Sequence, residues 1–93
     1  MIKSFGDKET ERIWYGSYAK KFPTDIQPIG RRKLRMINNA QDISDLRVPP
    51  GNKLEKLKGN LNDFWSIRIN NQWRIIFKWI GNDAFEVQVT AYH

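Results

Sequence analysis

The sequence predicts an α+β fold in which two amino-terminal helices pack on one face of a mostly antiparallel sheet. Two observations lead to this prediction. Up to residue 40 apolar residues recur with the helical period of about 3.6 residues. From Leu54 onward the period switches to two, and from residue 64 apolar and polar residues alternate as they do in half-buried strands. The 93 residues contain no repeat and no linker, so residues 1–93 are expected to form a single domain.

The first half of the chain supplies the helices. Residues 2–5 are a candidate edge strand, and the charged run at residues 7–12 opens the first helix, because acidic residues in a first turn suit the helix dipole. The expected packing residues of this helix are Ile13, Trp14 and Tyr18. After a break at residues 23–25, the second helix is expected to bury Ile26, Ile29, Leu34 and Ile37, to turn Arg31, Arg32 and Arg35 outward, and to end at residues 38–40. A brief helical turn is expected at residues 42–46, and Pro49-Pro50-Gly51-Asn52 predicts an exposed, non-helical passage.

Three strands are expected at residues 64–70, 73–79 and 85–90, joined into a meander. Opposed residues of antiparallel strands share a face of the sheet, so the parity of the apolar residues predicts the register. Three-residue loops at 70–72 and 81–83 keep every opposed pair apolar. These pairs are Ile69 with Trp73, Ile67 with Ile75, Trp65 with Phe77, Trp79 with Phe85, Phe77 with Val87, Ile75 with Val89, and Trp73 with Ala91. The helix-covered face then carries Trp65, Trp73 and Trp79, and Trp14 is expected in the same core.

On the opposite face this register places Arg68 directly opposite Arg74, with Thr90 on the other side of Arg74 and Tyr92 diagonal to it. Two opposed guanidinium groups repel by up to about 1 kcal/mol unless an anion or a carboxylate lies between them. Cleavage of RNA by its own 2′-hydroxyl needs proton transfer and fixed cations around the phosphate, so these residues suit that chemistry. The alternative is a solvated face with an incidental arginine pair.

The net charge of +6 is concentrated in one segment, because residues 31–58 carry eight basic and three acidic side chains. Such a block is typical of a surface that binds a polyanion, although a solvated helix face followed by a basic loop has the same composition. The candidate RNA-binding or ribosome-binding residues are Arg31, Arg32, Lys33, Arg35, Lys53 and Lys56.

Composition argues against several other classes of protein. The chain has no cysteine and a single histidine, His93, so no disulfide or thiolate zinc site can form, and no metal or cofactor is expected. No apolar run approaches the roughly 18 residues that span a bilayer, and the amino terminus is too polar for a signal sequence. We therefore expect a cytoplasmic protein with no membrane partner.

The sequence also resembles a known family. The stretch Pro49-Pro50-Gly51-Asn52-Lys53-Leu54-Glu55-Lys56-Leu57-Lys58-Gly59, the strands at 64–70 and 72–77, and the two ends of the chain are similar to the HigB and GraT branch of the RelE/ParE toxin superfamily. The resemblance implies a RelE-like toxin that cuts messenger RNA in the ribosomal decoding site and so inhibits translation and growth. It also implies a HigA-like or GraA-like antitoxin with a helix-turn-helix domain, through which the pair would bind operator DNA.

Matched to the family pattern, the catalytic candidates are Lys58, Arg68, Arg74, Tyr92 and His93. The resemblance implies that the arginines hold the scissile phosphate, that Lys58 steadies RNA or the transition state, and that Tyr92 and His93 position or move protons. Two positions depart from the pattern: Ala91 stands where relatives commonly have Asp, and Glu55 where some have His. Two alternatives therefore stay open, namely a non-cleaving basic module that binds an antitoxin and regulates its operon, and a ParE-like toxin directed at gyrase.

Overall fold

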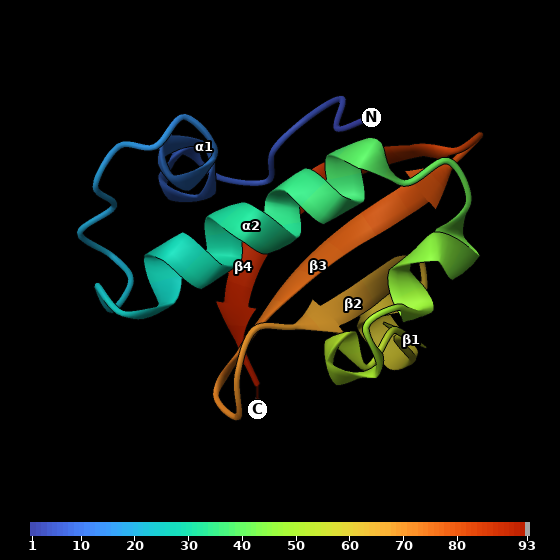
Figure 1. Ribbon diagram of the computed structural model, residues 1–93. Helices are drawn as coiled ribbons and strands as arrows, with labels where there is room; N and C mark the ends of the chain where they lie inside the picture. Colours follow the sequence, from blue (N-terminus) through green and yellow to red (C-terminus); the bar gives the residue numbers. More distant parts are fainter. Residues whose placement is uncertain (93) are drawn as a thin grey trace.

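The computed structural model describes residues 1–92, in which two helices lie over one face of a four-stranded sheet (Figure 1). The strand order β1-β2-β3-β4 follows the chain, and each neighbouring pair is antiparallel. The helices are α1, Lys8–Trp14, and α2, Ile26–Asn39, and the strands are β1, Glu55–Lys56, β2, Phe64–Arg68, β3, Trp73–Ile80, and β4, Asp83–Ala91. Short 3-10 helices occupy Ile43–Arg47, Pro50–Asn52 and Gly59–Leu61. The predicted α+β fold is confirmed.

Helix α1 is short and is fixed at its start by a cap. The Asp7 Oδ1 atom accepts a hydrogen bond from the Thr10 backbone N–H at 2.6 Å, which satisfies one of the free donors of the first turn. Thr10 itself is buried, and its Oγ1 accepts a hydrogen bond from the Val89 backbone N–H at 2.9 Å, so α1 is docked directly on β4. Helix α1 ends at Trp14, and Tyr18 is 62% exposed. The expectation that Tyr18 packs on the sheet was wrong because the helix stops a turn earlier.

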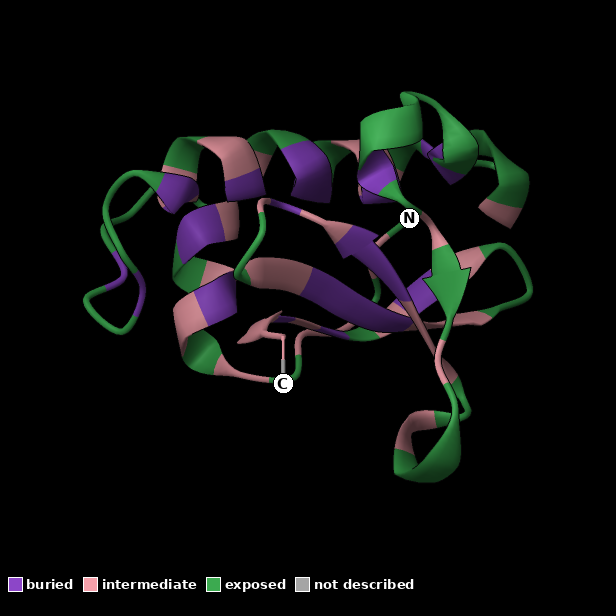
Figure 2. Ribbon diagram, turned by 90° about the horizontal axis from the view of Figure 1, so that it is seen from below, coloured by how far each residue is buried: buried purple, intermediate pink, exposed green. Residues whose placement is uncertain are grey.

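Helix α2 packs with the predicted stripe. Ile26, Leu34 and Ile37 are buried, and Ile29 is partly buried against the same core. Gly30 faces Ile69 of the sheet region and Ile13 of α1, so the small residue lies where α2 meets both. Buried positions lie on the sides of the helices that are turned toward the sheet (Figure 2).

The register of the β2–β3 hairpin is as predicted. Trp65 pairs with Phe77, Ile67 with Ile75, and Arg68 with Arg74. The same parity holds where β3 meets the end of β4, because Ile75 pairs with Val89, Arg74 with Thr90, and Trp73 with Ala91. The strict alternation of apolar side chains therefore predicted the half of the sheet that carries the arginine pair.

The tip of the β3–β4 hairpin differs from the prediction of a three-residue loop. Gly81 and Asn82 both have positive φ, 55° and 71°, and these two residues alone close the hairpin. Trp79 therefore pairs with Ala84 instead of Phe85, and Lys78 pairs with Phe85. A β-bulge at Glu86, whose φ is 52°, adds one residue to β4 and restores the predicted register beyond it. Ala84 takes the buried place expected for Phe85.

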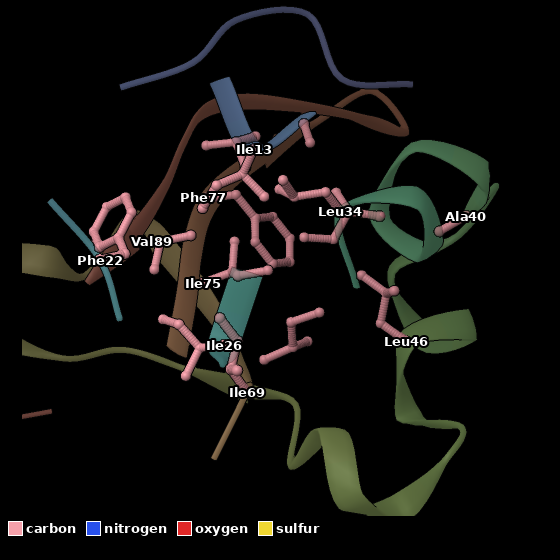
Figure 3. Close-up of a cluster of buried hydrophobic side chains, with 14 of the residues drawn as sticks. Ile13, Phe22, Ile26, Leu34, Ala40, Leu46, Ile69, Ile75, Phe77 and Val89 are labelled. Atoms are coloured by element: carbon pink, nitrogen blue, oxygen red, sulfur yellow. The ribbon is translucent and has the colours of Figure 1, made fainter. Parts of the chain in front are cut away.

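The core lies between the helices and the sheet (Figure 3). Phe77 of β3 is fully buried in this cluster together with Leu34 of α2 and Ile75. The four tryptophans, expected in the core, are all partly buried and pack around this cluster. They are Trp14, Trp65, Trp73 and Trp79.

Two further segments, residues 2–5 and 49–52, differ in part from the prediction. Ile2 and Phe5 form isolated parallel bridges with Ala84 and Val87, so the candidate amino-terminal edge strand is present only as two contacts beside β4. The passage expected to be exposed and non-helical contains the 3-10 helix Pro50–Asn52, and Asn52 is fully buried. Within residues 1–92 no helix has the length and apolarity needed to cross a membrane.

Candidate functional site

The predicted arginine pair is present on the face of the sheet opposite the helices. Arg68 of β2 pairs with Arg74 of β3, and both side chains are partly buried. Within residues 1–92 neither guanidinium forms an ion pair with a carboxylate, and the buried Nε of Arg74 has no hydrogen-bond partner. Two guanidinium groups opposed across neighbouring strands repel each other, and an anion bound between them would relieve this repulsion.

Tyr92 lies beside this pair at the carboxyl end of β4. The Arg74 guanidinium carbon is 4.9 Å from the centroid of the Tyr92 ring, a cation–π contact. The Tyr92 backbone N–H donates to the Gln72 carbonyl at 2.9 Å, which ties the end of the chain to the β2–β3 loop (Figure 1). Burial raises the pKa of the Tyr92 phenol, the charges of Arg74 and Arg68 offset part of this rise, and Glu55 adds to it. The phenol therefore keeps its proton at neutral pH.

A pocket of about 290 Å³ opens next to Tyr92. Five residues line it: Lys53, Glu55, Arg68, Asn71 and Tyr92. The Arg68 Nη2 atom donates to Asn71 Oδ1, which orients the guanidinium at the pocket wall. Two cations, a phenol, an amide and one carboxylate thus surround a space large enough for part of a nucleotide. Such a set can bind a phosphate and move protons next to it.

Comparisons with known proteins identify the family of the chain. A family model described as the RelE-like toxin HigB of type II toxin–antitoxin systems matches residues 3–93. The chain belongs to this family of HigB toxins. It is 42% identical to Toxin HigB-1 of Vibrio cholerae over 93 residues, which cover 99% of this chain and 98% of that protein. It is 34% identical over 94 residues to Endoribonuclease HigB of Proteus vulgaris, with both chains fully covered.

The fold of this HigB-family toxin is also that of a solved toxin. The YoeB–YefM complex from Staphylococcus aureus contains a chain that superposes with a TM-score of 0.63 at 22% identity, covering 100% of this chain and 95% of that one. The likeness at this identity establishes the shared RelE-like fold. The resemblance to the HigB branch, drawn from the motif at residues 49–77, is confirmed.

Two other catalytic candidates of the HigB-family chain, Lys58 and Arg74, do not line the pocket. Lys58 is exposed at the start of the 3-10 helix Gly59–Leu61 and is not among the residues that line the pocket. Arg74 does not line it either, because it lies against the ring of Tyr92. His93 lies outside the described residues. Its predicted role stays a prediction.

Two pocket residues were missed in the sequence. Glu55 reaches the pocket from β1, where it pairs with Ser66, and Asn71 does so from the β2–β3 loop. A two-residue strand gives no alternation to detect, so the sheet was predicted without β1 and Glu55 was read only as a departure from the family pattern. The signal for Asn71 was its place in the short loop that follows Arg68.

The basic residues of α2 do not form one surface. Arg32 and Arg35 are exposed, whereas Arg31 is partly buried and its guanidinium lies against Gly16. Lys33, expected on the RNA-binding surface, is only 7% exposed. Helical geometry explains the difference, because residues 26, 30, 33 and 37 form one stripe on α2 and all four are buried.

The loop cations have separate positions. Lys53, a candidate RNA-binding residue, lines the pocket, and its predicted role in binding stays a prediction. Lys56 is exposed, and its Nζ lies 5.6 Å from the centroid of the Trp65 ring. Within the described residues, Lys53 is therefore the cation of this loop that lines the pocket, together with Arg68 of β2.

Ala91, the second departure from the family pattern, points away from this pocket. It pairs with Trp73, whose ring packs edge-on against buried Phe22 at a centroid distance of 5.5 Å. Side chains alternate along a strand, so Ala91 shares the helix-covered face with Trp73, whereas Thr90 and Tyr92 share the face of Arg74. Within residues 1–92, residue 91 is not among the residues that line the pocket.

Proposed function

We propose that this HigB-family toxin is an endoribonuclease that cleaves messenger RNA on ribosomes in the cytoplasm and thereby inhibits translation and growth. The observation that carries the proposal is the pair Arg68 and Arg74, free of carboxylate partners within residues 1–92, beside a pocket that also holds Tyr92 and Glu55. The similarity along the full chain to a protein named Endoribonuclease HigB supports it.

The chemistry follows from the pocket residues. The 2′-hydroxyl of one nucleotide attacks the adjacent phosphorus, so that an O2′–P bond forms and the P–O5′ bond breaks, giving a 2′,3′-cyclic phosphate and a 5′-hydroxyl. Glu55 is the acidic residue of the pocket and accepts the proton of the 2′-hydroxyl. Arg68 and Arg74 stabilise the charge that develops on the phosphoryl oxygens.

Tyr92 acts as the proton donor in this scheme. Its raised pKa, caused first by burial, keeps the phenol protonated at neutral pH, so it can give a proton to the leaving O5′ oxygen but cannot act as a base. Lys58 and His93 are retained as candidates that steady RNA and move protons. Arg31, Arg32, Arg35, Lys53 and Lys56 are proposed to contact ribosomal or messenger RNA, with Lys33 removed from that set by its burial.

The toxin is further proposed to be held inactive by an antitoxin with a helix-turn-helix domain, through which the pair binds operator DNA. Membership of a family of type II toxin–antitoxin systems supports this partner, as does the fold shared with a toxin solved in complex with its antitoxin. The product of an adjacent reading frame should copurify with the toxin and restore growth when both are expressed.

The experiment uses a labelled messenger RNA on ribosomes reconstituted from purified components, and the same RNA alone. The native chain is expected to cleave the ribosome-bound RNA, and the double variant Arg68→Met, Arg74→Met to lose about 100-fold or more of the rate. Arg12→Met, on α1 and paired with Glu9, is the matched control and should keep the native rate.

Two further arms separate the alternatives. Ala91→Asp should cleave at a rate similar to that of the native chain, because residue 91 faces Trp73. If only Ala91→Asp cleaves, that carboxylate is needed and the proton transfer assigned to Glu55 is wrong. Growth arrest with intact transcripts on ribosomes would reject the endoribonuclease and favour a gyrase-directed or non-cleaving toxin.

A further inference from the structure

The chain buries a lysine that the proposed chemistry does not use. Lys33 is 7% exposed on the inner stripe of α2, and its Nζ donates to the Oδ1 atom of Asn52 at 2.5 Å. Asn52 is fully buried. Within residues 1–92 no carboxylate forms an ion pair with Lys33. Burying an ammonium group without a counter-charge is costly, and a methionine would fill the same stripe of the helix without this cost.

The amide nitrogen of the Asn52 side chain binds the backbone of the preceding segment, residues 46–48. Its Nδ2 donates to the carbonyl of Leu46 at 3.2 Å and to that of Val48 at 3.4 Å. Its backbone N–H donates to the Pro49 carbonyl at 2.9 Å. The side chain of Asn52 therefore joins α2, through Lys33, to the end of one 3-10 helix and to the turn that forms the next.

The residue that follows this anchor lines the pocket. Lys53 has a left-handed backbone conformation, φ 45°, which residues other than glycine adopt uncommonly. The Lys53 N–H donates to the Pro50 carbonyl at 3.1 Å, and two residues later Glu55 enters β1. The direction in which the chain leaves Asn52 thus sets where Lys53 and Glu55 stand relative to Arg68 and Tyr92.

We propose that Lys33 is a positioning residue of the site: its buried hydrogen bond to Asn52 fixes the turn that presents Lys53 and Glu55 to the pocket. The proposal rests on the endoribonuclease function proposed above, because it assigns the turn a part in that reaction. Burial, followed by the nearby charges of Arg32 and Arg68, lowers the pKa of Lys33.

The test compares Lys33→Met, which removes the donor and keeps the apolar stem, with Lys33→Gln, which keeps an N–H donor without the charge. Lys20→Met, an exposed lysine in the loop before α2, is the charge-matched control. For each variant, kcat and KM are measured on ribosome-bound RNA, the melting temperature is measured, and amide hydrogen exchange is followed by NMR.

Lys33→Met is expected to lower kcat about tenfold or more, because a displaced turn misplaces Glu55, and to raise KM as well, because Lys53 of the same turn is proposed to contact RNA. The amides of Asn52 and Lys53 should exchange at least about tenfold faster, while those of Phe77 and Val89 are unchanged. Lys33→Gln should recover most of the rate and the protection, and Lys20→Met should match the native chain.

A folded Lys33→Met chain with native kcat and native exchange at Asn52 and Lys53 would overturn the proposal. Lys33→Gln as impaired as Lys33→Met in both rate and exchange would overturn it too, because the hydrogen bond would then not be the cause. If Lys33→Met does not fold, the decision rests on Lys33→Gln. Native amide exchange at Asn52 and Lys53 in that variant supports the hydrogen bond as the cause, and fast exchange there rejects it. If the native chain cleaves nothing, the function proposal fails, whereas the exchange measurements still judge the role of Lys33.

Discussion

The guanidinium carbon of Arg74 lies 4.9 Å from the centroid of the Tyr92 ring, so one face of the phenol is covered by a cation. This contact joins two groups to which the proposed chemistry gives different tasks, because Arg74 is to stabilise charge and Tyr92 is to donate a proton. It also links β3 to the end of β4, whose side chains at Thr90 and Tyr92 share the face of Arg74.

Single replacements of Arg74 should separate the effect of its positive charge from the effect of its planar guanidinium shape. Arg74→Met is expected to lower kcat by about 100-fold to 1000-fold, the usual effect of losing one donor that acts in the transition state. Arg74→Lys should recover only part of the rate, because an ammonium cannot grip two phosphoryl oxygens or stack on Tyr92 as a planar guanidinium does. Single-turnover cleavage on ribosomes measures both, and equal rates for Arg74→Lys and the native chain would contradict the bidentate role.

The phenol of Tyr92 should titrate above the ordinary tyrosine value of about 10, because burial is the main cause of its raised pKa. The absorbance of tyrosinate near 295 nm, followed with pH in the native chain and in Tyr92→Phe, gives the titration of Tyr92 by difference. Glu55→Gln should lower the pKa of Tyr92, since the negative charge of Glu55 opposes phenolate formation.

The sign of the effect on stability follows from the same shift. Above pH 10 the unfolded chain loses the Tyr92 proton before the folded chain does, so the free energy of unfolding falls as pH rises toward the raised pKa. Tyr92→Phe should remove this part of the alkaline decline. An unchanged decline in Tyr92→Phe would assign the loss of stability to other groups.

Glu55→Gln should lower kcat by about 100-fold or more while leaving the fold unchanged, because glutamine has the same shape but cannot accept a proton. Glu55→His should retain much of the rate, since a neutral imidazole also accepts a proton. Glu11→Gln on α1 is the control for the loss of one negative charge. A Glu55→Gln chain with the native rate would transfer the role of base to another group.

Thr10→Val tests the docking of α1 on β4 and is a prediction about stability. The buried Val89 N–H loses its acceptor, Thr10 Oγ1, and valine has nearly the same volume, so the free energy of unfolding should fall by about 1–3 kcal/mol. Urea unfolding measures the change. Thr24→Val, at an exposed position before α2, should change the free energy of unfolding by less than about 0.5 kcal/mol.

Much of the fold and the centre of the site could be predicted from the sequence, because long alternating strands leave little freedom. A one-residue slip between β2 and β3 would turn one strand over and expose either Ile67 or Ile75, so apolar parity together with a three-residue loop predicts that Arg68 opposes Arg74. The same argument failed at the tip of the β3–β4 hairpin. Parity specifies which residues face the core, but it does not say that Gly81 and Asn82 both adopt positive φ or that Glu86 forms a bulge.

The parts of the site that were missed depend on contacts between segments far apart in the chain. Glu55 reaches the pocket because two residues of β1 pair with β2, and so short a strand has no period. Helical spacing places Lys33 on the same stripe as Ile26, Gly30 and Ile37, and this position indicates burial. A lysine is normally assigned to the surface, and only the three-dimensional structure reveals the buried amide of Asn52 that receives it.

The bulge at Glu86 separates the two ends of the β3–β4 hairpin. The tight turn at Gly81 and Asn82 and the extra residue at Glu86 shift the register by one residue in opposite senses, so their effects cancel before the strands reach Arg74. A change of one residue in the length of this turn can be compensated by gain or loss of the bulge. The outer end of the hairpin can therefore change without moving Arg74 or Tyr92.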